Sequence, residues 1–275
     1  MKKFYCALKY LCLAALAISL VALVAVVAYV VINGIDKISF NLIFGKYDPD
    51  APTLLPALAG TLQLIAISIL IAVPVGIASA VFLVEYTNNK GKFAKIVGVA
   101  TETLAGIPSI VYGLFGYLIF VVFFGWGYSM LAGGITLAIM ILPTVVRSTQ
   151  ESLLSVPGGL REGSYALGSS KVRTIFKIVL PSAASGIVTA VILAVGRVVS
   201  ESAVLILTVN MVVNKVPESL MSPGTSLALD IYYFASHGYP DEAAATALVL
   251  LVFVGILNLL AAYIGKLIKK STFGD

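Results

Sequence analysis

The chain alternates long apolar stretches with short polar segments. A helix needs roughly 20 consecutive apolar residues to cross about 30 Å of hydrocarbon. Apolar runs of this length, without strict alternation of apolar and polar residues, indicate helices and not barrel strands, because backbone groups in lipid must be paired within their own segment. The pattern predicts six membrane-spanning helices, near residues 11–32, 58–84, 104–124, 130–146, 184–209 and 243–268.

The composition supports an all-α, polytopic membrane protein. Hydrophobic residues make up 60% of the 275 positions and charged residues only 11%, against about 25% charged residues in an average soluble domain. The first apolar run is longer than the core of a secretory signal, and no small-residue cleavage site follows it before Asn33. We therefore expect this run to be retained as the first membrane helix.

Basic residues gather in segments that would share one side of the membrane. With the N-terminus in the cytoplasm, 14 of the 18 lysines and arginines lie in the two terminal segments and in the segments 90–95 and 147–181. Cytoplasmic loops carry an excess of basic residues. We therefore expect a multi-pass protein of the cell membrane with both termini in the cytoplasm. The topology accounts for the net charge of +5, so membrane lipid is the expected surrounding and no nucleic-acid partner is inferred.

The segment 147–181 has a pattern of its own. Its apolar residues recur at helical spacing between polar ones, and Pro157-Gly158-Gly159 and Gly168 are positions where helices end. The pattern predicts two short amphipathic helices followed by a basic approach to the fifth span. Such helices fit either a segment that lies on the bilayer surface or one that presses against another protein.

The spacing of this segment resembles the EAA loop of ABC importer permeases. Glu162-Gly163-Ser164, three residues, Gly168, nine residues, Ile178, one residue and Leu180-Pro181 match the family pattern E-A-A, three residues, G, nine residues, I-x-L-P. Gly163 and Ser164 depart from the two alanines of the family. Glycine costs a helix interior about 1 kcal/mol relative to alanine, so we expect a looser helix here.

Further stretches resemble one group within this family, the phosphate importer permeases. They are AGIPSIVYGLFG at 105–116, the whole stretch 142–183 and GRVVSESAVLILT at 196–208. The stretch SPGTSLALDIYYFASHG at 222–238 resembles the PstA type of subunit more than the PstC type. The resemblance implies the fold of a type I importer permease, called MetI-like. It divides the chain into an N-terminal helix and outer loop at 1–57, a core of five spans at 58–268 and a tail at 269–275, with the coupling loop 147–181 inside the core.

In that family the EAA loop is a coupling helix that sits in a groove of a separate ATP-hydrolysing subunit. The resemblance implies that Arg161, Glu162 and Gly168 fix its orientation. The groove would be filled by Tyr165, Ala166 and Leu167, and the expected coupling residues are Arg161, Glu162, Gly163, Ser164, Tyr165, Ala166, Leu167 and Gly168. The chain has no G-x4-G-K-[ST] phosphate-binding motif. We therefore expect no catalytic residue and no cofactor on this chain, with ATP and magnesium bound by the partner.

The resemblance also implies three partners. They are a PstC-like second permease that forms a heterodimer with this chain, a dimeric PstB-like ATPase and a PstS-like extracytoplasmic phosphate-binding protein. The segment 210–242 fits a docking surface for the binding protein or a plain solvent-facing loop. His237, the one histidine of the sequence, lies in this segment and cannot build a metal site by itself.

Arg197 and Glu201 are charged residues within the fifth predicted span. A charge at mid-bilayer costs from about 2.5 to more than 10 kcal/mol, so such residues face a protein interior or a water-filled path. On one helix, residues four apart share a face, and Ser200 falls near the same side. A guanidinium suits phosphate oxygens, and Glu201 would balance its charge between turnovers. Phosphate permeases carry an arginine and a glutamate in this span as path residues. The resemblance therefore favours a translocation path over a structural ion pair.

Three alternatives accompany this interpretation. Arg147, at the end of the fourth span, is either a residue of the path exit or a side chain that reaches out to the interface. The substrate could be another oxyanion, such as molybdate, sulfate or phosphonate. A proton-coupled carrier could relay protons through Arg197 and Glu201, but carriers commonly contain repeated halves and need no coupling loop. An intramembrane zinc protease is excluded because the H-E-x-x-H motif is absent.

Overall fold

The computed structural model describes residues 2–45, 53–87 and 91–273, and these residues form helices joined by turns and loops, without a strand. The all-α prediction is confirmed. Five helical stretches are long and apolar enough to cross a membrane, and a bent pair of helices can supply the sixth span. Lys46, Lys90, part of the expected outer loop (46–52) and the last two residues of the expected tail lie outside the described residues.

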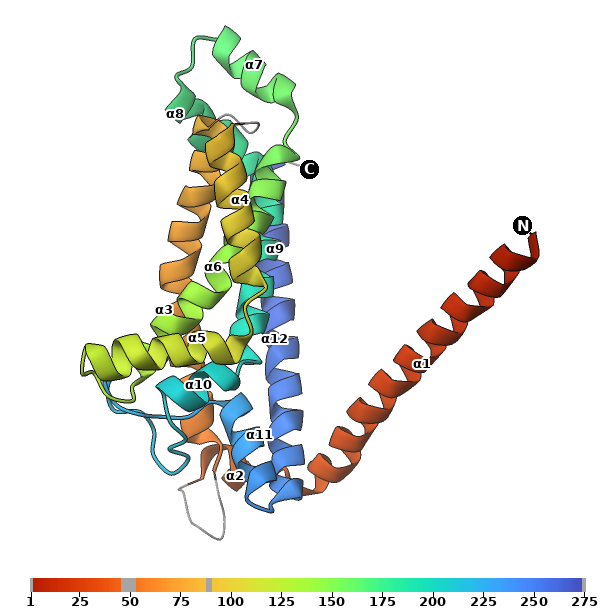
Figure 1. The fold of residues 1–275 in the computed structure, drawn as a ribbon, viewed down its shortest axis with the longest axis vertical. Helices are drawn as coiled ribbons and strands as arrows, with labels where there is room; N and C mark the ends of the chain where they lie inside the picture. The colour runs from red at the N-terminus through yellow and green to blue at the C-terminus, as the bar shows by residue number, and fades with distance from the viewer. Residues whose placement is uncertain (1, 46–52, 88–90, 274–275) are drawn as a thin grey trace.

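The long helices run side by side along the longest axis of the molecule (Figure 1). They are α3 (Leu55–Val81), α4 (Lys92–Ala105), α6 (Met130–Leu154), α9 (Leu180–Val199) and α12 (Pro240–Phe273). A further long helix, α1 (Lys2–Gly34), points away from them (Figure 1). Shorter helical pieces are η1 (Ile35–Lys37), α2 (Phe40–Phe44), η2 (Phe82–Tyr86), α5 (Ser109–Gly116), η3 (Tyr117–Phe123), α7 (Gly158–Ala166), α8 (Lys171–Thr174), η4 (Ile175–Val179), α10 (Ala203–Thr208) and α11 (Leu227–Ser236).

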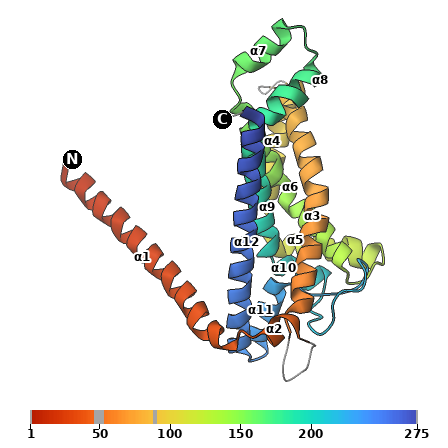
Figure 2. The same ribbon diagram turned by 180° about the vertical axis from the view of Figure 1, so that it is seen from behind.

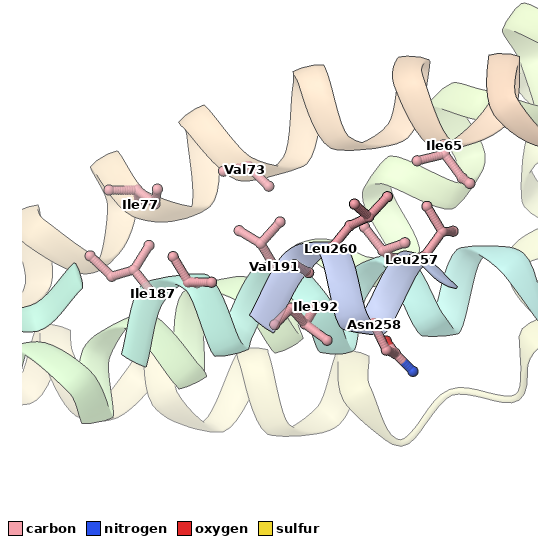
Figure 3. Close-up of a pocket in the computed structure, with 12 residues that line it drawn as sticks. Ile65, Val73, Ile77, Ile187, Val191, Ile192, Leu257, Asn258 and Leu260 are labelled. Atoms are coloured by element: carbon pink, nitrogen blue, oxygen red, sulfur yellow. The ribbon is translucent and has the colours of Figure 1, made fainter. Parts of the chain in front are cut away.

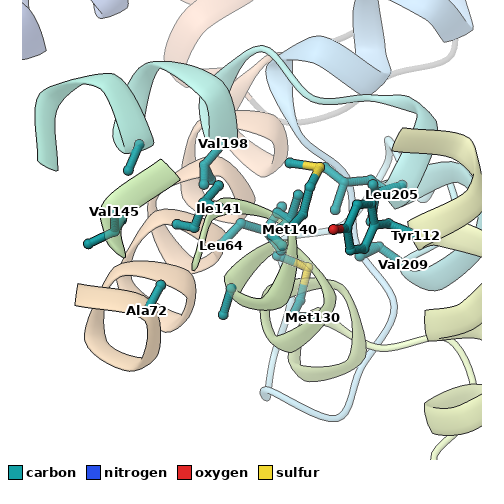
Figure 4. Close-up of a cluster of buried hydrophobic side chains, with 14 of the residues drawn as sticks. Leu64, Ala72, Tyr112, Met130, Met140, Ile141, Val145, Val198, Leu205 and Val209 are labelled. Atoms are coloured by element: carbon teal, nitrogen blue, oxygen red, sulfur yellow. The ribbon is translucent and has the colours of Figure 1, made fainter. Parts of the chain in front are cut away.

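The core lies where α3 packs on α6, the most extensive helix pair of the molecule. Figure 4 shows aliphatic, methionine and tyrosine side chains from several helices meeting there. Gly76 faces α6, and a Cβ at this position would lie 2.7 Å from the Val145 side chain. The Ser68 hydroxyl donates across the pair to the Gly134 carbonyl at 3.1 Å. Small residues and interhelical hydrogen bonds are the usual means of close packing between membrane helices.

Helix α1 diverges from the bundle, as both views show (Figures 1 and 2). It packs on α12 near its C-terminal end, where Gly34 lies against the Ala244 backbone. No residue in its most apolar stretch is buried within the chain. The apolar surface of α1 is therefore available to lipid or to another membrane helix.

The third span does not follow the prediction of one helix over 104–124. Helix α4 ends at Ala105, α5 begins at Ser109, and the two directions differ by 95°. Gly106-Ile107-Pro108 separates them. Proline has no N–H to donate and disfavours helical geometry in the preceding residue, which accounts for the break. Beyond it, α5 and η3 run across the bundle instead of along it (Figure 1).

The fourth and fifth spans also differ from prediction. Helix α6 continues past Val146 to Leu154, so the first of the two expected amphipathic loop helices is the end of α6. Helix α9 ends at Val199, and the chain resumes helical structure only at Ala203, in α10. The predicted single helix over 184–209 is therefore wrong. The interruption consists of Ser200, Glu201 and Ser202, so Glu201 lies in the break and Arg197 lies just before it.

A groove of about 500 Å³ lies between α3, α9 and α12 (Figure 3). Its walls are aliphatic apart from Asn258. They consist of Ile65, Val73, Ile77, Ile187, Val188, Val191, Ile192, Val195, Leu257, Asn258, Leu260 and Ala261. Burial of an unpaired anion among apolar groups is costly. The lining of this groove therefore does not suit an anion.

Candidate translocation and coupling sites

The two broken spans meet each other in the fold. Helix α5, which follows the first break, packs on α10, which follows the second. The contact is close, because a Cβ at Gly113 would lie 3.0 Å from the Val204 Cα and 3.2 Å from the Ala203 carbonyl oxygen. Breaks in membrane helices are tolerated where the irregular backbone is buried in protein or lines a cavity. The meeting of α5 and α10 is thus a candidate position for a polar site.

Arg197 lies in the last turn of α9, beside these breaks, and is half-buried. Among the described residues its guanidinium has no hydrogen-bond or ion-pair partner. Val198, the residue after Arg197, belongs to the same buried cluster as Tyr112 of α5, which is 5% exposed. The Tyr112 hydroxyl donates to the Leu104 carbonyl at 2.9 Å, across the break of the third span. The structure thus places an unpaired cation close to the break between α4 and α5.

Glu201 does not pair with Arg197 in the part of the chain that the structure describes, which corrects the expected geometry. Because α9 ends at Val199, the two residues do not share a helical face. The Glu201 carboxylate accepts a hydrogen bond from the Val204 N–H at 3.3 Å and so caps the start of α10. The Ser200 hydroxyl donates back to the Gly196 carbonyl at 3.0 Å. The three predicted residues gather at one break, but each has a different environment.

Arg147 lies apart from them in the part of α6 that extends past the predicted span. Its Nη1 lies 3.0 Å from Glu102 Oε1, and its Nε lies 3.3 Å from Glu151 Oε1. All three side chains are more than half exposed. Glu102 and Glu151 were not among the predicted residues. Glu151 could have been found from its spacing of four residues on one helix, whereas Glu102 comes from α4.

The predicted coupling residues lie on α7 and the turn that follows it. Pro157 precedes the helix, and Gly168 ends the turn with φ +78°, a conformation that favours glycine. Helix α7 projects at one end of the bundle (Figures 1 and 2). Tyr165 and Leu167 are 42% and 88% exposed. The other exposed members of the predicted set are Glu162, Gly163, Ala166 and Gly168.

Two of the predicted coupling residues face the protein instead. Ser164 is 5% exposed, and its hydroxyl lies 2.8 Å from that of Thr174 in α8. The Arg161 guanidinium forms an ion pair with Glu85 at 2.8 Å. Sequence reasoning missed Glu85, although a carboxylate at the end of an apolar run is a signal that could have found it. The segment thus has an exposed face and a face fixed to the bundle.

A metal centre finds no support in the described residues, which contain no group of three or more histidine, cysteine, aspartate or glutamate side chains placed to bind one. His237 stacks on Tyr233, and its Nδ1 lies 2.8 Å from the Tyr233 carbonyl oxygen. Both of these contacts of His237 are thus with Tyr233, in the last turn of α11.

The long apolar helices, the broken spans and the short helix α7 between α6 and α9 define a membrane-spanning helical bundle. Residues 72–273 match the family of binding-protein-dependent transport system inner membrane components, and the chain belongs to that family. It is therefore a permease subunit of an ABC importer, a multi-pass protein of the inner membrane. Subunits of this family are not enzymes themselves, since ATP is hydrolysed by a partner.

Similar curated proteins include two whose names give no substrate and several named for phosphate. The chain is 34% identical to the probable ABC transporter permease protein YqgI of Bacillus subtilis, over 94% of this chain and 93% of that one. It is 37% identical to the phosphate transport system permease protein PstA 1 of Mycobacterium tuberculosis strain H37Rv, over 76% of this chain and 68% of that one.

Solved structures support the MetI-like fold. A chain of a bacterial alginate ABC transporter superposes with a TM-score of 0.72 at 16% identity, over 96% of this chain and 95% of that one. A chain of the MetNI methionine ABC transporter superposes with a TM-score of 0.61 at 21% identity, over 78% of this chain and 94% of that one. At these identities the likeness establishes the fold alone, and the type I permease architecture is confirmed.

Proposed function

We propose that this permease subunit carries inorganic phosphate inward and that Arg197 contacts the anion on its way. The observation that carries the proposal is a half-buried guanidinium, without an ion-pair partner among the described residues, beside two broken spans. The names of the PstA relatives support phosphate as the substrate.

The chemistry of the site favours an oxyanion. A cation within a membrane bundle is costly unless it faces water or an anion. A guanidinium offers a planar fork of N–H donors that matches two phosphate oxygens, and such charge-assisted bonds are among the strong ones. Glu201 and Ser200 lie at the same break. The Glu201 carboxylate limits how tightly the site holds an anion, which lets phosphate leave. Arg147, with Glu102 and Glu151, forms a mixed-charge cluster at the exit.

The exposed face of α7 is the docking site for the ATPase. In this proposal the α7 end of the bundle and both termini face the cytoplasm, and a dimeric PstB-like ATPase receives Tyr165 and Leu167 in its groove. A PstC-like permease completes the channel. A PstS-like binding protein delivers phosphate at the opposite end, where α11 lies in the segment 210–242.

The test is phosphate import by the reconstituted complex of both permeases, ATPase and binding protein. We expect Arg197→Gln to lower import about 10- to 100-fold, because lost hydrogen bonds to a charged group are worth about 1.5–3 kcal/mol. Lys9→Gln, which removes a cation at an exposed position on α1, serves as the control and keeps the parent rate. Undiminished import by Arg197→Gln would overturn the role of Arg197. Stimulation of ATP hydrolysis by sulfate or molybdate instead of phosphate would overturn the substrate.

A further inference from the structure

The end of α3 is joined to the coupling helix by a buried ion pair. Helix α3 continues into the π-helical turn η2, which carries Glu85. Arg161 of α7 donates to Glu85 Oε1 from Nε at 3.0 Å and from Nη2 at 2.8 Å. The two side chains are 19% and 6% exposed. This pair links residues that are 76 positions apart in the sequence.

The same guanidinium also binds the end of α6. Its Nη1 donates to the Val156 carbonyl and its Nη2 to the Leu153 carbonyl, both at 2.9 Å. The last carbonyls of a helix lack partners within the helix, and a positive charge near them is favourable. A carboxylate as buried as Glu85 requires a paired and hydrogen-bonded cation. Arg161 therefore joins three elements: α7, the end of α6 and the end of α3.

A second cation of the coupling segment contacts the same turn. Lys171 Nζ, at the start of α8, lies 4.7 Å from the centroid of the Tyr86 ring, within the range of a cation–π contact. Tyr86 is the neighbour of Glu85 in η2. The Ser164–Thr174 hydrogen bond holds α7 on α8. The coupling segment therefore contacts η2 through two of its helices, α7 and α8.

The remaining contacts of α7 explain why this link matters. The backbone of α7 packs mainly against α8 and η4, which are its neighbours along the chain toward α9. Helix α3 is not adjacent to α7 in sequence, yet it forms the most extensive helix pair of the bundle, with α6. A displacement of α7 would reach α6 and α9 through the chain itself, and α3 in turn through its packing on α6. The direct connection from the coupling segment to the end of α3 is made by side chains, at Glu85 and Tyr86.

We propose that Glu85 is a positioning residue that, through Arg161, makes α3 move together with the coupling helix when the ATPase changes conformation. The proposal rests on the proposed docking of the ATPase on α7. It assigns to Glu85 and Arg161 the transmission of that movement to a third span, in addition to the two spans that flank the loop. Coupling between distant sites requires such a physical element, whose position both sites influence.

A distance measurement tests this link without reference to the substrate. In the assembled complex, with Cys6 and Cys12 replaced by serine, spin labels are attached at Ala78→Cys in α3 and Tyr263→Cys in α12, both exposed positions. We expect addition of ATP and magnesium to change the distance between the labels in the parent. In Glu85→Gln we expect most of this change to be lost, because glutamine keeps the shape and loses the charge.

The second readout is phosphate imported per ATP hydrolysed. We expect this ratio to fall about tenfold in Glu85→Gln, within the range typical of coupling between distant sites. Glu85→Asp, which keeps the charge, should recover most of the ratio. Glu85→Gln combined with Arg161→Gln should lose no more than Arg161→Gln alone, because Arg161 also binds the Val156 and Leu153 carbonyls. Lys9→Gln, which removes a cation at an exposed position on α1, is the matched control with the parent ratio. If Glu85→Gln fails to assemble, Arg161→Lys tests the contact between Arg161 and Glu85. Lysine keeps the positive charge but lacks the planar guanidinium that donates from two nitrogen atoms to Glu85.

The outcomes separate the two proposals. A parental distance change and a parental ratio in Glu85→Gln would overturn the role of Glu85, as would an equal loss in Lys9→Gln. A parent complex that shows the ATP-dependent distance change but imports no phosphate would overturn the proposed substrate, while the distances would still decide the role of Glu85.

Discussion

Gly60 determines how closely the segment before α11 approaches α3. A Cβ at this position would collide with the carbonyl oxygen of Thr225. Overpacking of a tight contact costs about 1–3 kcal/mol, so Gly60→Ala should lower the thermal unfolding temperature of the purified protein in detergent. Gly98 in α4 is the matched control, because a Cβ there would meet no atom within 4 Å. Gly98→Ala should be neutral or stabilising by up to ~1 kcal/mol. Equal shifts in the two variants would contradict the assigned contact.

Asp230 is a buried carboxylate in α11. Thr225 donates a hydrogen bond to its Oδ1, while Oδ2 is buried without a partner among the described residues. Burial raises the pKa of Asp230 from 3.8 to about 7, against the opposing effect of the hydrogen bond from Thr225. A carboxyl in this state binds its proton more tightly in the folded protein than in the unfolded one.

The raised pKa predicts how stability depends on pH. Between the unfolded and folded pKa values the folded state holds more protons, so the free energy of unfolding falls as pH rises, by at most about 1.4 kcal/mol per pH unit from this group. We expect the unfolding temperature to fall between pH 5 and 7 and to level off above. Asp230→Asn should remove this contribution to the slope, whereas Asp241→Asn, at an exposed carboxylate paired with Lys37, should keep it. A parental slope in Asp230→Asn would show that another group titrates.

At the scale of elements, the hydrophobic pattern predicted where apolar helices lie but not their directions. The apolar pattern placed the third span at 104–124, as one helix, and so left most of α4 outside it. It likewise placed the fifth span at 184–209, as one helix that in the structure is divided between α9 and α10. The local signals for the breaks were present in Gly106-Ile107-Pro108 and Ser200-Glu201-Ser202. The bounds of α7 were easier to predict, because Pro157 and Gly168 restrict the backbone on each side of it.

The same limit applied to the candidate site. Arg197 could be selected from sequence because a charge in an apolar run is costly wherever it points. The expectation that Glu201 shares a helical face with Arg197 was wrong. A spacing of four residues places two side chains on one face only where the helix is continuous, and α9 ends at Val199. Glu85 was missed as the partner of Arg161, because local spacing carries no information on a contact between residues 76 positions apart.

The exposed face of α7 predicts an effect on ATPase binding. Leu167 is 88% exposed, and full burial of a leucine side chain contributes about 1.5–3 kcal/mol. Leu167→Asp should weaken binding of the ATPase at least about tenfold, the factor that corresponds to ~1.4 kcal/mol. Titration of the ATPase onto the purified permease pair measures this change. Ser236→Asp adds the same charge at an exposed position on α11 and should leave the affinity unchanged. Parental affinity in Leu167→Asp would place the ATPase on another surface.

At the scale of the whole molecule, the long helices connect two chemically different ends. Helix α7 lies at one end, and α11 and α2 lie at the other, while α1 diverges from the bundle (Figures 1 and 2). An importer subunit must contact an ATPase on one side of the membrane and receive a solute on the other side. The arrangement allows this because the loop between α6 and α9 is fixed to the ends of three long helices, α3, α6 and α9.

The distribution of basic residues predicts which end faces the cytoplasm. Most lysines and arginines fall in segments on the α7 side, and cytoplasmic segments carry such an excess. In a variant with Cys6 and Cys12 replaced by serine, an impermeant thiol reagent should label Leu167→Cys only in inside-out vesicles. It should label Tyr239→Cys, an exposed position at the α11 end, only in intact cells. Full denaturation before labelling gives the total thiol of each variant as a control. The reverse pattern would invert the molecule in the membrane, and α7 could then not meet a cytoplasmic ATPase.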